Sequence, residues 1–298
     1  MVDVASITVA VISLVASITV AIASGIITAY NDDRKARRET DALLRKYRDP
    51  LLLAAQDLQA RLYNLINSNI ITNFMRREEE WQDTLFIYTA FLVGQYLSWT
   101  WILRRQAQFL CFASDKKSRS QNLISNLDKI KACFNEDSNG RAEAPFMLWK
   151  GHQAAIGELM SVADDKEGGQ MYCMGFSTFT HKWKAAGLVM QARQEQAEIS
   201  SVKTPNPNVD FRKWFRPVED GIRTIHDARQ RGDRTPENRL RRLQHLMLDL
   251  AFELDPDGVR RNANEMGRVA AAPRCHCSTC DKIVRSTCKL DEEAGKRS

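Results

Sequence analysis

Residues 235–258 read TPENRLRRLQHLMLDLAFELDPDG, and this stretch predicts the fold more clearly than any other. Thr235 and Pro236 form a helix start, with a capping hydroxyl followed by a proline at the first helical position. Apolar residues then recur at three- and four-residue steps, the spacing of one buried helix face. They are Leu240, Leu243, Met247, Leu250 and Leu254. His245 and Asp249 are also four residues apart, and we expect them to form an exposed pair.

The same periodicity recurs towards the N-terminus. Further apolar stripes begin at Leu51, Trp81, Leu123, Pro145 and Phe211. No stretch alternates convincingly between polar and apolar residues, and only residues 171–179 could form a short strand, although they fit a loop equally well. The sequence therefore predicts an all-α protein, with a helical bundle over residues 45–260 and a flexible Cys-rich tail over residues 261–298.

The composition is that of a globular protein. Among 298 residues, 44% are hydrophobic and 27% are charged, which argues against a disordered chain. The net charge of +6 is small and spread along the sequence. This distribution argues against a nucleic-acid partner, which would favour a concentrated basic face.

Residues 4–30 contain no charged side chain. A helix of this length reaches roughly 40 Å, which exceeds the ~30 Å hydrocarbon core of a bilayer. We expect residues 1–30 to be a single transmembrane anchor with the lipid bilayer as its partner. The alternative is a cleaved signal peptide, but the segment before the apolar run lacks Lys and Arg, and the run is longer than such peptides need.

Basic residues follow the anchor directly and none precedes it. They are Arg34, Lys35, Arg37, Arg38, Arg45, Lys46 and Arg48. Because Lys and Arg stay on the cytoplasmic side, the N-terminus should lie outside and the C-terminal domain in the cytoplasm, joined by a basic juxtamembrane linker over residues 31–44.

Small residues form one stripe along the anchor. The stripe consists of Ser6, Ala10, Ser13, Ser17, Ala21, Ser24 and Thr28. Stripes of this kind let helix backbones approach closely in lipid, so self-association into a homo-oligomer is one interpretation. A lipid-facing helix rich in Ser and Ala is the other.

A second uncharged run covers residues 84–103. It could be a second membrane span, but polar residues interrupt it and arginines flank both ends, so no charge asymmetry favours insertion. The preferred interpretation is a buried helix at the centre of a bundle.

Five of the residues in the tail could be metal ligands. Cys275, His276, Cys277, Cys280 and Cys288 lie within fourteen residues of one another. The four cysteines could hold zinc, although only Cys277 and Cys280 form a C-x-x-C pair. A flexible tail with exposed thiols and S-acylation are the alternatives. The remaining cysteines fit buried positions in a reduced cytosolic domain.

The sequence has no motif for phosphate, dinucleotide, hydrolase or zinc-protease chemistry, so no reaction can be named. An enzyme on the bundle would use polar residues beside the aromatic stripes. The candidates for such a ligand pocket are Tyr63, Arg104, Arg105, His152 and Glu158. Gly151 and Gly157 sit inside a predicted helix, which indicates either close approach of another helix or two short helices that meet there.

Several segments resemble a widespread, uncharacterised family of all-helical proteins. They include Tyr47–Leu52, Asp57–Asn64, Gln95–Trp99, Ala155–Met160 and Leu254–Asp257. The resemblance implies a shared helical fold and a membrane-proximal position, with no known activity. Together these observations predict a single-pass membrane protein whose cytosolic helical domain is a binding or scaffold module for an unknown protein partner. The alternatives are an enzyme and a zinc-binding tail.

Overall fold

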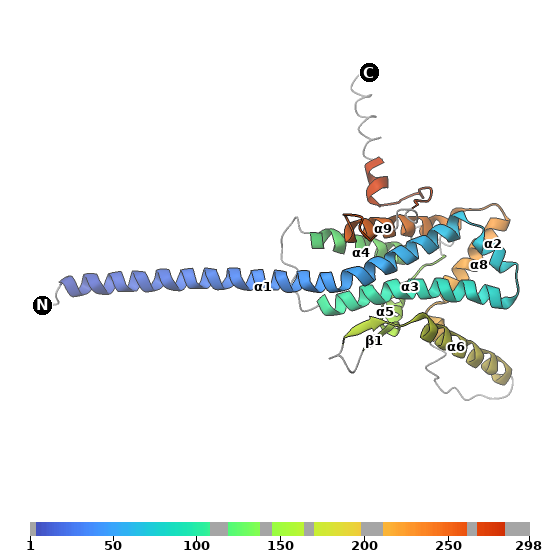
Figure 1. The fold of residues 1–298 in the computed structure, drawn as a ribbon, viewed down its shortest axis with the longest axis horizontal. Coiled ribbons are helices and arrows are strands. Elements are labelled where there is room, and N and C mark those ends of the chain that lie inside the picture. Colours follow the sequence, from blue (N-terminus) through green and yellow to red (C-terminus); the bar gives the residue numbers. More distant parts are fainter. Residues whose placement is uncertain are drawn as a thin grey trace, which may run out of the picture.

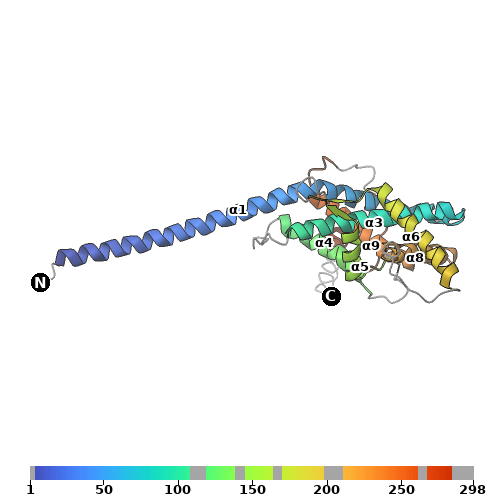
Figure 2. The ribbon, with the colours of Figure 1, turned by 90° about the horizontal axis from the view of Figure 1, so that it is seen from below.

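The structure is a computed structural model that describes residues 4–107, 119–137, 145–163, 170–197, 211–260 and 267–283. Helices dominate these residues, and α1 (Val4–Asn67) is the longest of them. The N-terminal half of α1 projects alone from a bundle, while its C-terminal half lies inside the bundle (Figure 1). The perpendicular view in Figure 2 shows the same separation.

The centre of the bundle is a three-helix layer. The C-terminal half of α1 lies against α3 (Glu79–Ala107) and α9 (Asn238–Leu254). The apolar stripes predicted for these helices form their contact faces, because the residues that recur at helical spacing are nearly inaccessible to solvent. Among them are Leu51, Leu58, Leu62, Leu85, Leu92, Leu243, Met247 and Leu250.

Shorter helices surround this layer. They are α2 (Ile70–Met75), α4 (Arg119–Asn135), α5 (Lys150–Leu159), α6 (Phe176–Ala197), α8 (Arg216–Gln230) and a 3-10 turn (Thr235–Glu237). The 3-10 turn leads directly into α9, so helical structure begins at Thr235 and Pro236 as predicted. Thr235 does not act as the cap, because it lies inside the 3-10 turn.

One small sheet interrupts the helical pattern. β1 (Ser161–Ala163) and β2 (Met171–Cys173) form an antiparallel hairpin in which Val162 pairs with Tyr172. The sequence offered only the second of these strands, as an alternative to a loop. The described residues are mostly helical, as the sequence predicted. Strands of three residues are too short for an alternating pattern to be visible in the sequence.

The uncharged run over residues 84–103 lies within α3 and is part of the bundle core. Leu85, Phe86 and Val93 are fully buried, and α3 packs against α1, α5, α6 and α8. Thr89, a polar residue inside the run, accepts a hydrogen bond from Arg61, at 3.0 Å between Oγ1 and Nε. The side-chain oxygen of Gln95 is buried without a hydrogen-bond partner among the described residues. The interpretation as a buried bundle helix is confirmed.

Residues 31–44, expected to be a linker, continue α1 as helix. Asp49 and Pro50 have the sequence pattern of a helix start, with an Asp cap and a proline at the first helical position. The helix start that this pattern predicts is wrong, since α1 runs through Pro50 without ending. A proline inside a helix removes one backbone hydrogen bond and commonly bends the helix. In Figure 1, α1 changes direction as it enters the bundle.

No helix in the described part of the chain is long and apolar enough to cross a membrane. The large apolar side chains of residues 17–30 in α1 are exposed, with 67% of Val20 and 64% of Ile26 accessible. Ser17, Ala21, Ser24 and Thr28 of the small-residue stripe are exposed as well. The side chains of the stripe's other members, Ser6, Ala10 and Ser13, lie outside the described part.

Gly157 marks a close contact between two helices. A Cβ atom added to it would lie 2.8 Å from Trp101 Cβ and 2.9 Å from the backbone oxygen of Leu97, both on α3. At Gly151, on the same helix α5, an added Cβ atom would meet no atom within 4 Å. Of the two interpretations of these glycines, close helix approach applies to Gly157 alone.

The substitution Gly157→Ala should therefore lower the stability of the bundle by about 1–3 kcal/mol, because α5 must move away from α3. Gly151→Ala adds the same methyl group to the same helix in open space, so it should be neutral or slightly stabilising. Thermal denaturation of the two variants tests this contrast. Equal melting temperatures would show that the α3–α5 contact is not tight.

Candidate metal centre

The helix α9 is enclosed on several sides. Three consecutive residues, Leu246, Met247 and Leu248, are all buried, which no amphipathic surface helix allows. His245 and Asp249 are consequently buried too, with 1% and 8% of their surface accessible. The prediction that they form an exposed pair is wrong, because residues 267–283 cover the side of α9 that the sequence pattern marks as polar.

Residues 267–283, here called the C-terminal segment, cross α9 and are held by side chains of that helix. The Gln244 amide donates a hydrogen bond to the Gly267 carbonyl at 2.7 Å. Arg242 Nη1 donates to the Pro273 carbonyl at 3.1 Å. Val269, Ala272 and Cys277 of the segment are buried, so this part of the chain packs on the bundle and differs from the flexible tail predicted for residues 261–298.

A turn in the C-terminal segment brings three cysteines together. Arg274 has a positive φ of 57°, a left-handed conformation that reverses the chain just before Cys275. A helical turn then begins at residue 278, and the amide of Asp281 donates to the Cys277 carbonyl at 3.0 Å. Cys275 and Cys277 therefore lie between this reversal and the helical turn, and Cys280 lies within the helical turn.

The three thiols converge on one ring nitrogen of His245. Its Nδ1 atom lies 3.5 Å from the sulfur of Cys275 and 3.6 Å from the sulfurs of Cys277 and Cys280. All four ligand atoms lie within 4.8 Å of one another. In a tetrahedral zinc site with Zn–S and Zn–N bonds of about 2.3 and 2.0 Å, the N···S edge is roughly 3.5 Å. The three N···S distances thus match those of a tetrahedral metal site.

A backbone hydrogen bond fixes the tautomer of His245. Its Nε2 atom lies 2.8 Å from the carbonyl oxygen of Val269. A carbonyl only accepts hydrogen bonds, so Nε2 carries the proton and the lone pair of the neutral ring is on Nδ1. Metal-binding histidines commonly donate their second ring N–H in this way, which orients the ring.

Hydrogen bonds behind the ligands hold them in place. Cys277 Sγ accepts from the Cys280 amide and from Arg268 Nη1, both at 3.3 Å. Asp249 accepts from the Ser278 amide at 2.6 Å, from the Ser278 hydroxyl at 3.0 Å and from Arg268 Nη2 at 3.3 Å. One buried carboxylate on α9 therefore positions both flanks of the cysteine turn.

The contacts within the cluster give its thiols different pKa values. Donation from Cys275, the largest cause, and from the Cys280 amide holds the pKa of Cys277 well below its ordinary value, against the opposing effect of burial. The pKa of Cys275 is raised, because its proton is shared with Cys277 and the group is buried. By contrast, burial raises the pKa of both Cys133 and Cys173 to about 11. Burial also raises the pKa of Cys280. The thiolate form is therefore favoured at Cys277 alone among these five cysteines.

Three of the four predicted zinc ligands, Cys275, Cys277 and Cys280, meet in the structure. The fourth, Cys288, lies outside the described residues, and His245 occupies the remaining corner. His276 is 73% exposed, has its Nδ1 atom 3.8 Å from Asp281 Oδ1 and is not part of the cluster. The sequence did contain a signal for His245: three consecutive apolar residues, Leu246 to Leu248, follow it, so apolar side chains face more than one side of the helix.

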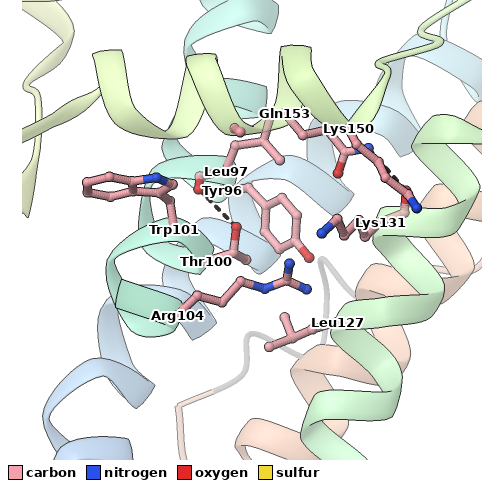
Figure 3. A pocket seen from close by; sticks show the side chains of 10 residues that line it. Tyr96, Leu97, Thr100, Trp101, Arg104, Leu127, Lys131, Lys150 and Gln153 are labelled. Carbon is pink, nitrogen blue, oxygen red and sulfur yellow. Dashed lines mark hydrogen bonds between the residues drawn. The ribbon is translucent and has the colours of Figure 1, made fainter. Parts of the chain in front are cut away.

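The residues proposed for a ligand pocket do not gather in one place. Tyr63 lines a cavity of about 410 Å³ beside Arg61 and Tyr88. Arg104 lines a different cavity, shown in Figure 3, together with Tyr96 and Lys131.

The other three candidates do not line the cavity of Figure 3. The Arg105 guanidinium stacks on Trp101 at 5.1 Å, and His152 packs edge-on against Trp214 with 5.4 Å between ring centres. Glu158 is exposed on α5. The five residues therefore do not form the single enzymatic pocket that the sequence suggested.

No family model, curated protein or solved structure matches this chain. The resemblance to an uncharacterised helical family remains a prediction.

Replacing Asp249 with Ala should loosen the C-terminal segment, because Ser278 and Arg268 lose their shared acceptor at a cost of about 1–3 kcal/mol. Limited trypsin digestion should then cut faster after Arg268 and Arg274. Asp257→Asn, which changes an exposed carboxylate in the turn after α9, is the control and should leave the digestion rate unchanged. Equal rates in both variants would contradict the role assigned to Asp249.

Proposed function

We propose that the chain is a membrane-anchored helical module whose C-terminal segment is fastened to the bundle by a structural zinc ion. The convergence of His245 Nδ1 with the sulfurs of Cys275, Cys277 and Cys280 carries this proposal. The ligands come from two parts of the chain, so a bound ion would cross-link α9 to the segment that covers it.

The donor set favours zinc. Thiolate and imidazole ligands in a tetrahedral arrangement are typical of Zn²⁺, whereas calcium and magnesium prefer oxygen ligands. Four protein ligands leave no open coordination position for water or substrate, which is typical of structural rather than catalytic zinc. The burial of Cys277, at 0% accessible surface, fits the same interpretation.

Zinc would supply stability that the C-terminal segment lacks by itself. Residues 267–277 have no regular secondary structure and are held mainly by side chains of α9. Because the ligands of such sites seldom meet in an unfolded chain, the free energy of metal binding becomes folding free energy. The bundle could then present a fixed surface to a protein partner, which is the binding or scaffold role expected from the sequence.

The membrane anchor is part of the same proposal. The support is the uncharged stretch over residues 4–30 and the exposure of Ile18, Val20 and Ile26 on a helix that projects from the bundle. Isolated apolar surface of this kind favours lipid over water. Self-association through the small-residue stripe would occur in that environment.

The basic residues after Tyr30 support a cytoplasmic position for the bundle. Zinc thiolate ligands must be reduced, and the cytosol keeps cysteines reduced. The proposed cytoplasmic position of the bundle and the proposed zinc site are therefore consistent with each other.

The full chain, purified under reducing conditions, should contain about one zinc ion per molecule by atomic emission analysis. His245→Ala and Cys277→Ser should lose that zinc during dialysis against a chelator, because each removes one of four ligands. Circular dichroism of the same samples should show that the helical bundle persists. Absence of zinc from the wild-type chain would overturn the proposal.

Two cysteine variants serve as controls for the ligand set. Cys173→Ser removes a half-buried thiol on β2 and should retain zinc, since this residue is not in the cluster. Cys288→Ser tests the ligand set predicted from the sequence against the one in the structure. Zinc retained in Cys288→Ser and lost in His245→Ala supports the structural set, and the reverse result would reject it.

Protease treatment of sealed vesicles with their cytosolic face outward should remove a C-terminal tag without detergent. The anchor should remain as a protected fragment, because the membrane shields it. A lumenal marker protein that stays intact verifies that the vesicles are sealed. A tag that resists the protease until detergent is added would contradict the proposed orientation.

A further inference from the structure

A small cavity lies between α3, α4 and α5 (Figure 3). Its volume is about 90 Å³, which has room for several heavy atoms. Apolar side chains form part of the wall, and the rest is polar. The polar side chains that line it include those of Tyr96, Arg104, Lys131, Lys150 and Gln153.

Three cations meet at this cavity, and each comes from a different helix. Arg104 belongs to α3, Lys131 to α4 and Lys150 to α5. Among the described residues, the carboxylate that pairs with this group is Asp128, whose Oδ1 atom lies 2.9 Å from Arg104 Nη2. Three positive charges therefore face one negative charge.

The floor of the cavity contains a neutral hydrogen-bond donor. The Tyr96 ring is buried, with 2% of its surface accessible, and its hydroxyl points into the space between Lys131 and Arg104 (Figure 3). Burial is the main reason why the pKa of this hydroxyl is raised, so the group keeps its proton.

The walls of the cavity are held at fixed positions. The side-chain amide of Gln153 donates hydrogen bonds to the Lys131 carbonyl at 3.1 Å and to the Leu148 carbonyl at 2.8 Å. The bond to the Lys131 carbonyl joins α5 to the backbone of α4. The close packing of Gly157 against Trp101 joins α5 to α3. The three cations are thus placed by the bundle itself rather than by a mobile surface loop.

Holding the three cations close together raises the electrostatic free energy of the empty cavity. Burial lowers the pKa of Lys131, and the positive charges of Arg104 and Lys150 add to that effect. Like charges held together favour a bound anion, which would offset the repulsion. The positive end of α5, which begins at Lys150, acts in the same direction.

We infer that this cavity binds the phosphate group of a phosphorylated ligand. A phosphate offers several acceptor oxygens and up to two negative charges, which matches one guanidinium, two ammonium groups and one hydroxyl around a small space. The surplus of positive charge and the number of donors favour phosphate over a single carboxylate. The site does not depend on zinc, because it shares no side chain with the metal centre.

The phosphate could belong to a lipid headgroup or to a soluble molecule. The C-terminal end of α3 and helix α4 lie at the end of the bundle from which α1 projects (Figure 1). The helical turns of α1 between Tyr30 and Tyr47, however, extend over about 25 Å. Both sources therefore belong in the experiment.

The experiment uses the full, zinc-loaded chain in phosphatidylcholine vesicles, and the readout is its melting temperature from tryptophan fluorescence. One arm adds inorganic phosphate in place of chloride at equal ionic strength, and the other replaces part of the lipid with a phosphorylated inositol lipid. We expect Tm to rise by at least about 2 °C in one or both arms. A rise with inorganic phosphate indicates a soluble ligand, and a rise with the lipid alone indicates a headgroup.

Because phosphate also stabilises proteins non-specifically, the decisive quantity is the difference between two matched variants. Lys131→Gln removes a cation from the cavity. Lys129→Gln removes the same charge from the same helix, two residues away and therefore on a different face. The rise should persist in Lys129→Gln, disappear in Lys131→Gln and shrink in Lys150→Gln, with zinc content unchanged throughout. No rise in the wild-type chain, or equal rises in Lys129→Gln and Lys131→Gln, would overturn the inference.

Discussion

The hydrogen bond between His245 and the Val269 carbonyl is the contact on which the C-terminal architecture depends. It joins a helix to a segment that has no secondary structure of its own at that point, and it leaves the lone pair of the ring directed at three thiols. Without it, the imidazole could rotate away from the three thiols, and the set of four ligands would not be defined. The structure thus uses one backbone acceptor to determine both the tautomer and the position of a buried histidine.

Sequence reasoning was most successful where packing depends on periodicity. The stripes around Leu58, Leu127 and Leu243 became buried faces, because residues three and four apart must share one side of a helix. It was least successful where a distant segment changes the environment of a residue. His245 and Asp249 have the spacing of an exposed pair, and only the chain some thirty residues later makes them interior.

The cysteine cluster likewise has a part that local spacing indicated and a part that depends on a distant segment. The short spacing of Cys275, Cys277 and Cys280 identified them as candidate zinc ligands, with a flexible tail and S-acylation as the alternatives, and the structure brings the three together. The fourth ligand could not be found from spacing, because it comes from a helix rather than from the same turn. Short strands and the helix that continues through Pro50 were also missed, and in each case tertiary contacts override a local signal.

The two candidate sites are connected through α4. Arg239 of α9 is buried and donates hydrogen bonds to the carbonyls of Cys133 and Phe134 at the end of α4, at 3.2 and 2.8 Å. The same helix supplies Lys131 to the cavity. The helix that carries the metal ligand is therefore fastened to the helix that carries a cation of the other site.

The continuity of α1 has a geometric consequence for the whole molecule. A flexible tether would let the bundle rotate freely relative to the N-terminal half of α1. An uninterrupted helix instead fixes the rotation of one relative to the other. Each residue in an α-helix turns the chain by about 100°, so one residue inserted between Asn31 and Leu44 would swing the bundle through more than a quarter of a circle about the α1 axis. The number of residues in that stretch therefore determines which side of the bundle faces a neighbouring molecule.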